Sequence, residues 1–169
     1  AGTETDLGLQ LTSALVTELM PLVVALRHAQ GLPFLVLEEP EAHLHPRLVR
    51  AVIRCLCRLV RRGVRVLITT HSATVAQQVN NLVKLGCLTP ETRAEQQRRF
   101  GYSEIEYLHT EEVGAHEFRF HDDGRTVVES IVPDADGLGF PMRTFNEALH
   151  DFVDETLALN ALLDPEIEQ

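Results

Sequence analysis

The residues best suited to chemistry follow a short apolar run, Phe34 to Leu37. Directly after this run the chain gathers acids and histidines: Glu38, Glu39, Glu41, His43 and His45. Carboxylates can bind a magnesium ion or orient a water, and a carboxylate with histidines can bind zinc. The cluster therefore predicts a bound metal, an activated water or only a polar turn.

A transition-metal site is the first of these hypotheses. His43, His45 and Glu41 supply the nitrogen and carboxylate ligands that zinc or a similar ion prefers. However, Pro46 follows at once and opens a helical pattern, and a spacing of two residues in a turn sends the two rings apart. A metal-dependent hydrolase that uses these three residues stays open as an alternative.

Phosphate chemistry is the second hypothesis. A carboxylate at the tip of a buried parallel strand suits magnesium, which keeps several waters and takes one or two protein carboxylates. A second carboxylate can activate a water for attack on a phosphoryl group. The next apolar run, residues 64–69, ends in Thr70, His71 and Ser72, so an imidazole that can donate to a terminal phosphate comes to the same place.

The surrounding elements are expected to bring these two groups together. Residues 34–37 and 64–69 read as strands buried on both faces, and residues 46–62 between them read as a helix that begins at Pro46 and ends at Gly63. A strand, helix and strand in this order form a right-handed crossover with parallel strands. Both loops after the strands then open on the edge where α/β sheets bind ligands. Helices are also expected over residues 12–28 and 72–82.

Beyond Gly86 the pattern changes. We expect a polar helix over 90–99, a hairpin of strands 117–120 and 126–132 around Asp123-Gly124, and a closing helix that carries Phe145, Leu149, Phe152, Val153 and Leu157. We therefore predict two parts, 1–86 and 87–169, with the second packed on the first. The loop Asp134-Ala135-Asp136-Gly137 follows an apolar strand, and we interpret it as an ordinary Asp-Gly turn.

Composition limits the remaining classes. The chain has 169 residues, enough for one core, and a formal net charge of −10 argues against indiscriminate binding of nucleic acid. A stripe of arginines on the 46–62 helix is expected to be a solvated face, with a phosphate or acidic partner as the alternative: Arg47, Arg50, Arg54, Arg58 and Arg61. The longest apolar run, Leu19 to Leu26, is too short to span a membrane, and three cysteines that cannot all pair favour a reduced, cytoplasmic setting.

Two of these segments resemble one family. FLVLEEPEAHLHP is similar to the Walker B region of ABC-type P-loop ATPases, in the form found in prokaryotic ATPases related to the recombination-repair and overcoming-lysogenization-defect nucleases. VLITTHSATV is similar to their histidine switch, and Leu11 to Leu19 resembles a degenerate signature segment. The resemblance covers about residues 9 to 82. It implies an α/β fold: a partial, three-layer P-loop-type core of parallel sheet, with the hairpin and closing helix added.

The resemblance also implies roles. Glu38 matches the acid that holds Mg²⁺ through water, Glu39 the glutamate that activates water, and His71 the switch histidine. Thr12 and Ser13 match signature residues that meet the ATP of an opposite subunit in a homodimer, although Ala14 and Leu15 depart from the usual glycines. The stretch that holds Glu41, His43 and His45 falls where the family has a loop at the subunit interface.

One family motif is absent from the sequence. No G-x-x-x-x-G-K-[ST] loop, which holds ATP phosphates, occurs in these 169 residues. We therefore expect the chain to be the C-terminal half of an ATPase that is inactive alone, and relatives that repair DNA leave a nucleic-acid partner open for the longer parent. A non-catalytic regulatory or dimerisation module is the alternative.

Overall fold

The computed structural model describes residues 33–121, 123–134 and 139–163, together with residues 20, 23, 24 and 31. Its order of elements is β1 (Phe34–Glu38), α2 (Pro46–Val60), β2 (Arg65–Thr69), α3 (Ala73–Cys87), α4 (Pro90–Phe100), η2 (Thr110–Glu112), β3 (Ala115–Phe120), β4 (Thr126–Ile131) and α5 (Arg143–Leu163). The predictions for Thr12, Ser13 and the 12–28 helix lie outside the described residues, apart from helical backbone at 20, 23 and 24.

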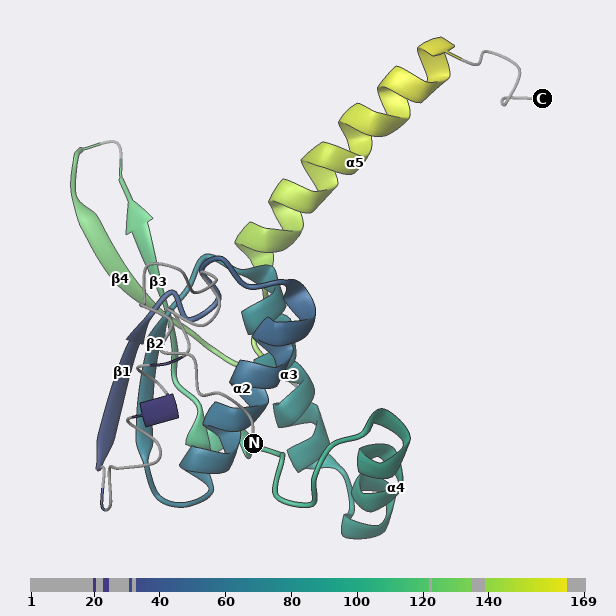
Figure 1. Cartoon of the computed structure of the whole chain (residues 1–169). Coiled ribbons are helices and arrows are strands. Elements are labelled where there is room, and N and C mark those ends of the chain that lie inside the picture. The colour runs from purple at the N-terminus through teal and green to yellow at the C-terminus, as the bar shows by residue number, and fades with distance from the viewer. Residues whose placement is uncertain are drawn as a thin grey trace, which may run out of the picture.

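The crossover unit is confirmed. β1 and β2 pair in parallel, with Phe34 opposite Arg65 and Glu38 opposite Thr69. Pro46 stands in the first turn of α2, and Gly63 takes a φ of 88° after the helix has ended, which a residue with a side chain adopts only at a cost. Figure 1 shows α2 and α3 side by side on one side of this strand pair.

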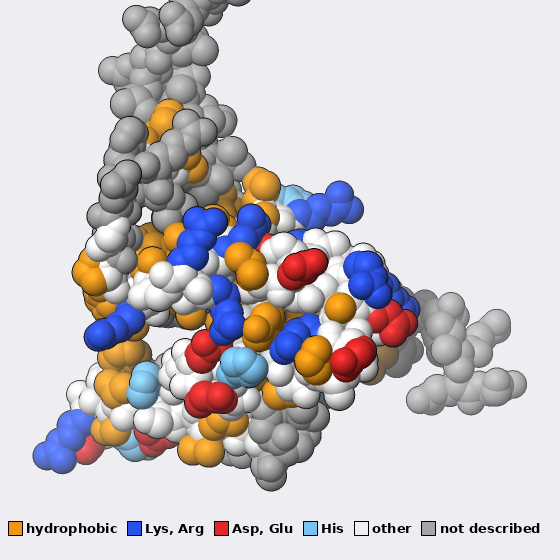
Figure 2. All heavy atoms as spheres, turned by 90° about the horizontal axis from the view of Figure 1, so that it is seen from below, with side chains coloured by type: hydrophobic (Ala, Val, Ile, Leu, Met, Phe, Trp, Pro, Cys, Tyr) orange, Lys and Arg blue, Asp and Glu red, His pale blue; other side chains and the backbone are white. Residues whose placement is uncertain are grey.

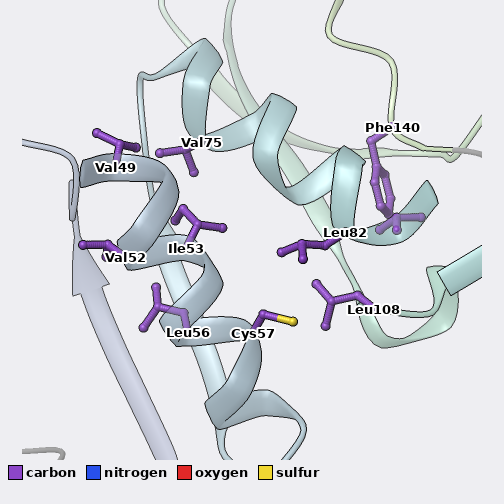
Figure 3. Packing of buried hydrophobic residues seen from close by; sticks show 10 residues of the cluster. Val49, Val52, Ile53, Leu56, Cys57, Val75, Leu82, Leu108 and Phe140 are labelled. Carbon is purple, nitrogen blue, oxygen red and sulfur yellow. The ribbon is translucent and has the colours of Figure 1, made fainter. Parts of the chain in front are cut away.

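The hydrophobic core lies between α2, α3 and the facing side of the strands. Its buried side chains include Val49, Ile53, Leu56, Val75, Leu82, Leu108 and Phe140. Figure 3 shows Ile53, Val75, Leu82 and Leu108 directed into the space between α2 and α3. Leu35 and Leu37 of β1 pack against this cluster. Phe34, Val36 and Leu67, on the other side of the strands, are 48%, 57% and 51% exposed.

The prediction that both strand faces are buried is therefore wrong for the described part of the chain, because α2 and α3 cover one face. The structure is a mixed α/β arrangement with a small parallel sheet and a small antiparallel one. It is consistent with a P-loop-type fold, and the three-layer core stays a prediction.

The segment after α3 returns to the core. α3 runs five residues past the expected end at Leu82, to Cys87, and Leu108 donates its backbone N–H to the carbonyl oxygen of Leu82 over 3.0 Å. A Cβ at Gly86 would stand 1.9 Å from the carbonyl oxygen of Leu108, so only glycine permits this approach. The side chain of Asn80 binds both the N–H and the C=O of Phe140, each over 2.9 Å.

The elements expected beyond Gly86 are present. α4, the β3–β4 hairpin with Gly124 at a φ of 80°, and α5 lie close to their predicted positions. α5 extends away from the rest of the molecule in Figure 1, and residues 150–160 are all exposed. Of the Asp134 to Gly137 loop only Asp134 is described, and its N–H binds the carbonyl of Gly139 over 2.8 Å. In the described part of the chain, no helix has the length and apolar character needed to cross a membrane.

Candidate functional site

The two strand ends meet as the crossover requires. The backbone N–H of Glu39 extends the strand ladder by donating to Thr69 over 2.9 Å. Beyond that bond, Nε2 of His71 lies 3.4 Å from Oε1 of Glu39. The side chains of His71 and Glu39 are 89% and 48% exposed, so both remain open to a ligand. We call Glu38, Glu39, Glu41, Thr70 and His71 the strand-end cluster.

Glu39 has an unusual backbone. Its φ is 43°, in the left-handed region that residues other than glycine rarely adopt, and His43 has a φ of 60°. Between them the N–H of Ala42 donates to the carbonyl of Glu39 over 2.8 Å, which closes a tight turn. Strained residues of this kind persist only where the surrounding structure holds them in place, and they concentrate at functional sites. The backbone strain at Glu39 therefore supports a functional role for this side chain.

Glu38 ends β1 on the side of the sheet that α2 and α3 do not cover. Glu38 alternates with Leu37, which packs on the core, so the side chain of Glu38 is exposed. The next residue in the sequence, Glu39, is exposed as well. Two exposed carboxylates at a strand end match the needs of Mg²⁺, which takes few protein ligands and keeps its waters. The donor set thus fits a magnesium ion held through water, with Glu38 as the first candidate.

The zinc-type alternative does not assemble. Among the residues that the structure describes, no group of three or more His, Cys, Asp and Glu side chains could hold a metal ion, and His43, His45 and Glu41 are all described. His45 instead serves as the N-cap of α2, where its Nδ1 accepts the N–H of Arg47 over 3.3 Å. Neither Glu38 nor Glu39 caps this helix.

Glu41 makes contacts that the sequence did not reveal. Its Oε1 accepts hydrogen bonds from the hydroxyl of Thr70 and from the backbone N–H of His71, the latter over 3.2 Å. Its Oε2 is buried and has no hydrogen-bond partner among the described residues. The carboxylate is therefore turned toward the loop after β2. The interface role predicted for Glu41, His43 and His45 stays a prediction.

Three arginines of the α2 stripe form ion pairs within the chain: Arg54, Arg58 and Arg61. Arg54 and Arg58 flank the carboxylate of Glu106, with Arg54 Nη2 2.7 Å from Oε2 and Arg58 Nε 2.9 Å from Oε1. The N–H of Ser103 also donates to Glu106 Oε2 over 2.9 Å. Glu106 is 0% exposed. We call this contact of α2 and Arg93 with residues 101–113 the arginine dock.

Further contacts complete the arginine dock. Arg61 binds Glu112 over 2.9 Å, and the guanidinium groups of Arg61 and Arg93 lie 4.4 and 4.0 Å from the ring centre of Tyr107. The thiol of Cys57 donates to the carbonyl of Tyr107 over 3.5 Å. Burial, with the charge of Glu106 as the next cause, raises the pKa of Cys57 to about 11. Figure 2 shows basic and acidic side chains interspersed on one face of the molecule, without a large patch of one sign.

The prediction of a solvated stripe is therefore wrong for Arg54, Arg58 and Arg61, whereas Arg47 and Arg50 are exposed as predicted. The contacts of Arg54, Arg58 and Arg61 lie within the chain, so those three guanidinium groups offer little to a phosphate backbone or an acidic partner.

Comparison with known proteins relates one segment to a family. Residues 16–76 match the family described as "AAA domain, putative AbiEii toxin, Type IV TA system". The match covers less than half of the chain, but it includes both loops of the strand-end cluster. No curated protein and no solved structure matched the chain. The segment that carries the strand-end cluster is thus similar to AAA-type domains of the P-loop ATPase class.

Proposed function

We propose that the strand-end cluster is the hydrolytic half of an ATP site. Glu39 orients and deprotonates the attacking water, Glu38 holds Mg²⁺ through water, and His71 donates a hydrogen bond to the terminal phosphate. The observation that carries this proposal is the approach of His71 Nε2 to within 3.4 Å of Glu39, at the ends of parallel neighbouring strands. The similarity of residues 16–76 to AAA-type domains supports it.

The residues of this chain have separate tasks. Glu39 stands at the end of a short strand, which fixes its backbone, and its exposed carboxylate can accept a proton from water. His71 shares that exposure and can contact both the carboxylate and an incoming phosphate oxygen. When bound, Mg²⁺ neutralises the charge of the phosphates. The phosphates themselves need a glycine-rich loop, which these 169 residues do not contain.

The remaining predictions concern the rest of the chain. We propose that residues 1–86 belong to the ATPase domain and 87–169 form an extension, that Thr12 and Ser13 meet the nucleotide of a second copy in an ABC-type homodimer, and that His43 and His45 face that copy. A reducing, cytoplasmic setting is proposed, and the free thiols of Cys55 and Cys57 support it. The further relation to repair and overcoming-lysogenization-defect nucleases rests on the two sequence motifs.

The test uses a longer protein that joins this chain to a phosphate-binding loop. Glu39→Gln keeps the size of the side chain but removes its basicity, so ATP turnover should fall by about 100-fold or more while Mg-ATP binding persists. Glu104→Gln, an exposed glutamate outside the strand-end cluster, is the matched control. Unchanged turnover in Glu39→Gln rejects the proposal.

A non-catalytic regulatory or dimerisation module is the second candidate, and the missing phosphate loop favours it for these 169 residues. Calorimetry of the chain with Mg-ATP separates the two. Micromolar binding by the chain alone contradicts the non-catalytic module, because it would show that the chain holds nucleotide without a phosphate loop.

A further inference from the structure

We infer that Glu41 is a positioning residue that fixes the loop after β2, so that His71 stays beside Glu39. This inference rests on the proposed function for its effect on ATP turnover. Its geometric part stands on the contacts of Glu41 alone.

The first step is the bridge between the two loops. Glu41 belongs to the turn after β1, and its Oε1 binds both the hydroxyl of Thr70 and the N–H of His71 in the loop after β2. Thr70 Oγ1 also accepts the N–H of Ser72 over 3.0 Å. One carboxylate oxygen thus organises three consecutive residues at the start of α3, where a negative charge is favourable because of the helix dipole.

The second step concerns what else could hold His71 in place. Its imidazole is 89% exposed and contacts Glu39, which is itself about half exposed. An exposed pair of this kind contributes little to its own geometry. The backbone of residues 70–72 must therefore set the position of the ring. Glu41 binds this backbone from the other loop, and Thr70 binds it from within the same loop.

The third step concerns the direction of Glu41. Its Oε2 is buried, so the carboxylate has lost much of its contact with water. Burial of a carboxylate is costly unless hydrogen bonds to the charged form compensate. The bonds from Thr70 and His71 both reach Oε1, so they supply this compensation on one side of the carboxylate only, and they tie the orientation of the side chain to the loop after β2.

The first experiment measures amide hydrogen exchange of His71 by NMR in the 169-residue chain. In Glu41→Ala the amide should exchange about tenfold faster, because a charge-assisted hydrogen bond is lost. Glu41→Gln keeps an acceptor oxygen and should retain most of the protection. Glu104→Ala is the control. Thr70→Val serves if Glu41→Ala does not fold, and it should speed exchange at Ser72. Unchanged exchange at His71 in Glu41→Ala, or at Ser72 in Thr70→Val, overturns the inference.

The second experiment separates positioning from general stability, in the longer protein with a phosphate loop. Glu41→Ala should lower kcat about tenfold with KM for ATP within about twofold, and Glu41→Gln should restore most of it. In a His71→Ala background, Glu41→Ala should lower kcat no further, because it acts through His71. Additive losses overturn the inference. Unchanged turnover in Glu39→Gln rejects the proposed function instead, and the exchange result still decides whether Glu41 fixes the loop.

Discussion

The strand-end cluster and the arginine dock both bring acidic and basic side chains together, but the exposure of the charged groups differs between them. In the arginine dock, Glu106 is fully buried between Arg54 and Arg58. In the strand-end cluster, Glu39 and His71 keep about half and most of their surface exposed. A density of charged residues therefore does not identify a functional site. Exposure and unused hydrogen-bonding capacity distinguish groups that can react from groups that hold the fold.

The largest expected effect tests whether the arginine dock excludes solvent and reagents. At pH 8, Cys57 should react with a thiol reagent more slowly than the exposed Cys87, because Cys57 is buried and its raised pKa leaves about 100-fold less thiolate than its unfolded value of 9.0 would give. Mass spectrometry of the alkylated protein measures both rates, and in urea the two rates should converge. Equal rates in the native chain would show that the arginine dock does not exclude the reagent from Cys57.

The same thiol predicts a pH dependence. Its pKa rises from 9.0 to about 11 on folding, so between these values the unfolded chain loses a proton that the folded chain keeps. The free energy of unfolding should therefore fall as the pH rises from about 9 to 11, and the fall should be smaller in Cys57→Ala. Urea titrations at both ends of this range provide the measurement.

The next effect concerns the buried carboxylate. Glu106→Ala leaves Arg54 and Arg58 without their partner, and because these arginines are 25% and 47% exposed the cost should be about 2 kcal/mol of unfolding free energy, below that of a fully buried pair. Glu104→Ala in the same segment is exposed and should change stability by less than about 0.5 kcal/mol. If both variants unfold at the same urea concentration, Glu106 does not hold the arginine dock.

The smallest effect belongs to the strand-end cluster. At Glu39 the left-handed backbone penalises any residue with a Cβ, so Glu39→Gly should be more stable than Glu39→Ala by about 1 kcal/mol. Thermal unfolding of the two variants measures the difference. The reverse order would mean that Glu39 is not strained, which would remove one of the supports for its role.

The local parts of this arrangement could be predicted from the sequence. The apolar runs before Glu38 and Thr70 specify strands, and Pro46 and Gly63 bound the helix between them, so the meeting of Glu39 and His71 follows from connectivity. The β3–β4 hairpin follows from Asp123-Gly124 in the same way.

The long-range pairings could not be predicted from the sequence. Glu41 and Thr70 are 29 positions apart, and Arg54 and Glu106 are 52 apart, and no spacing rule connects them. A stripe of arginines has the same helical period whether water or a buried glutamate faces it. The apolar run of β1 likewise predicted burial on both sides, whereas Phe34 and Val36 have no cover among the described residues.

One distance decides whether Glu39 activates the water that attacks ATP. A structure of the longer protein with its phosphate loop, Mg²⁺ and a non-hydrolysable ATP analogue would show it. We expect a carboxylate oxygen of Glu39 about 3 Å from a water in line with the terminal phosphate. A Glu39 carboxylate that points away from the phosphates, with another residue bound to that water, would contradict it.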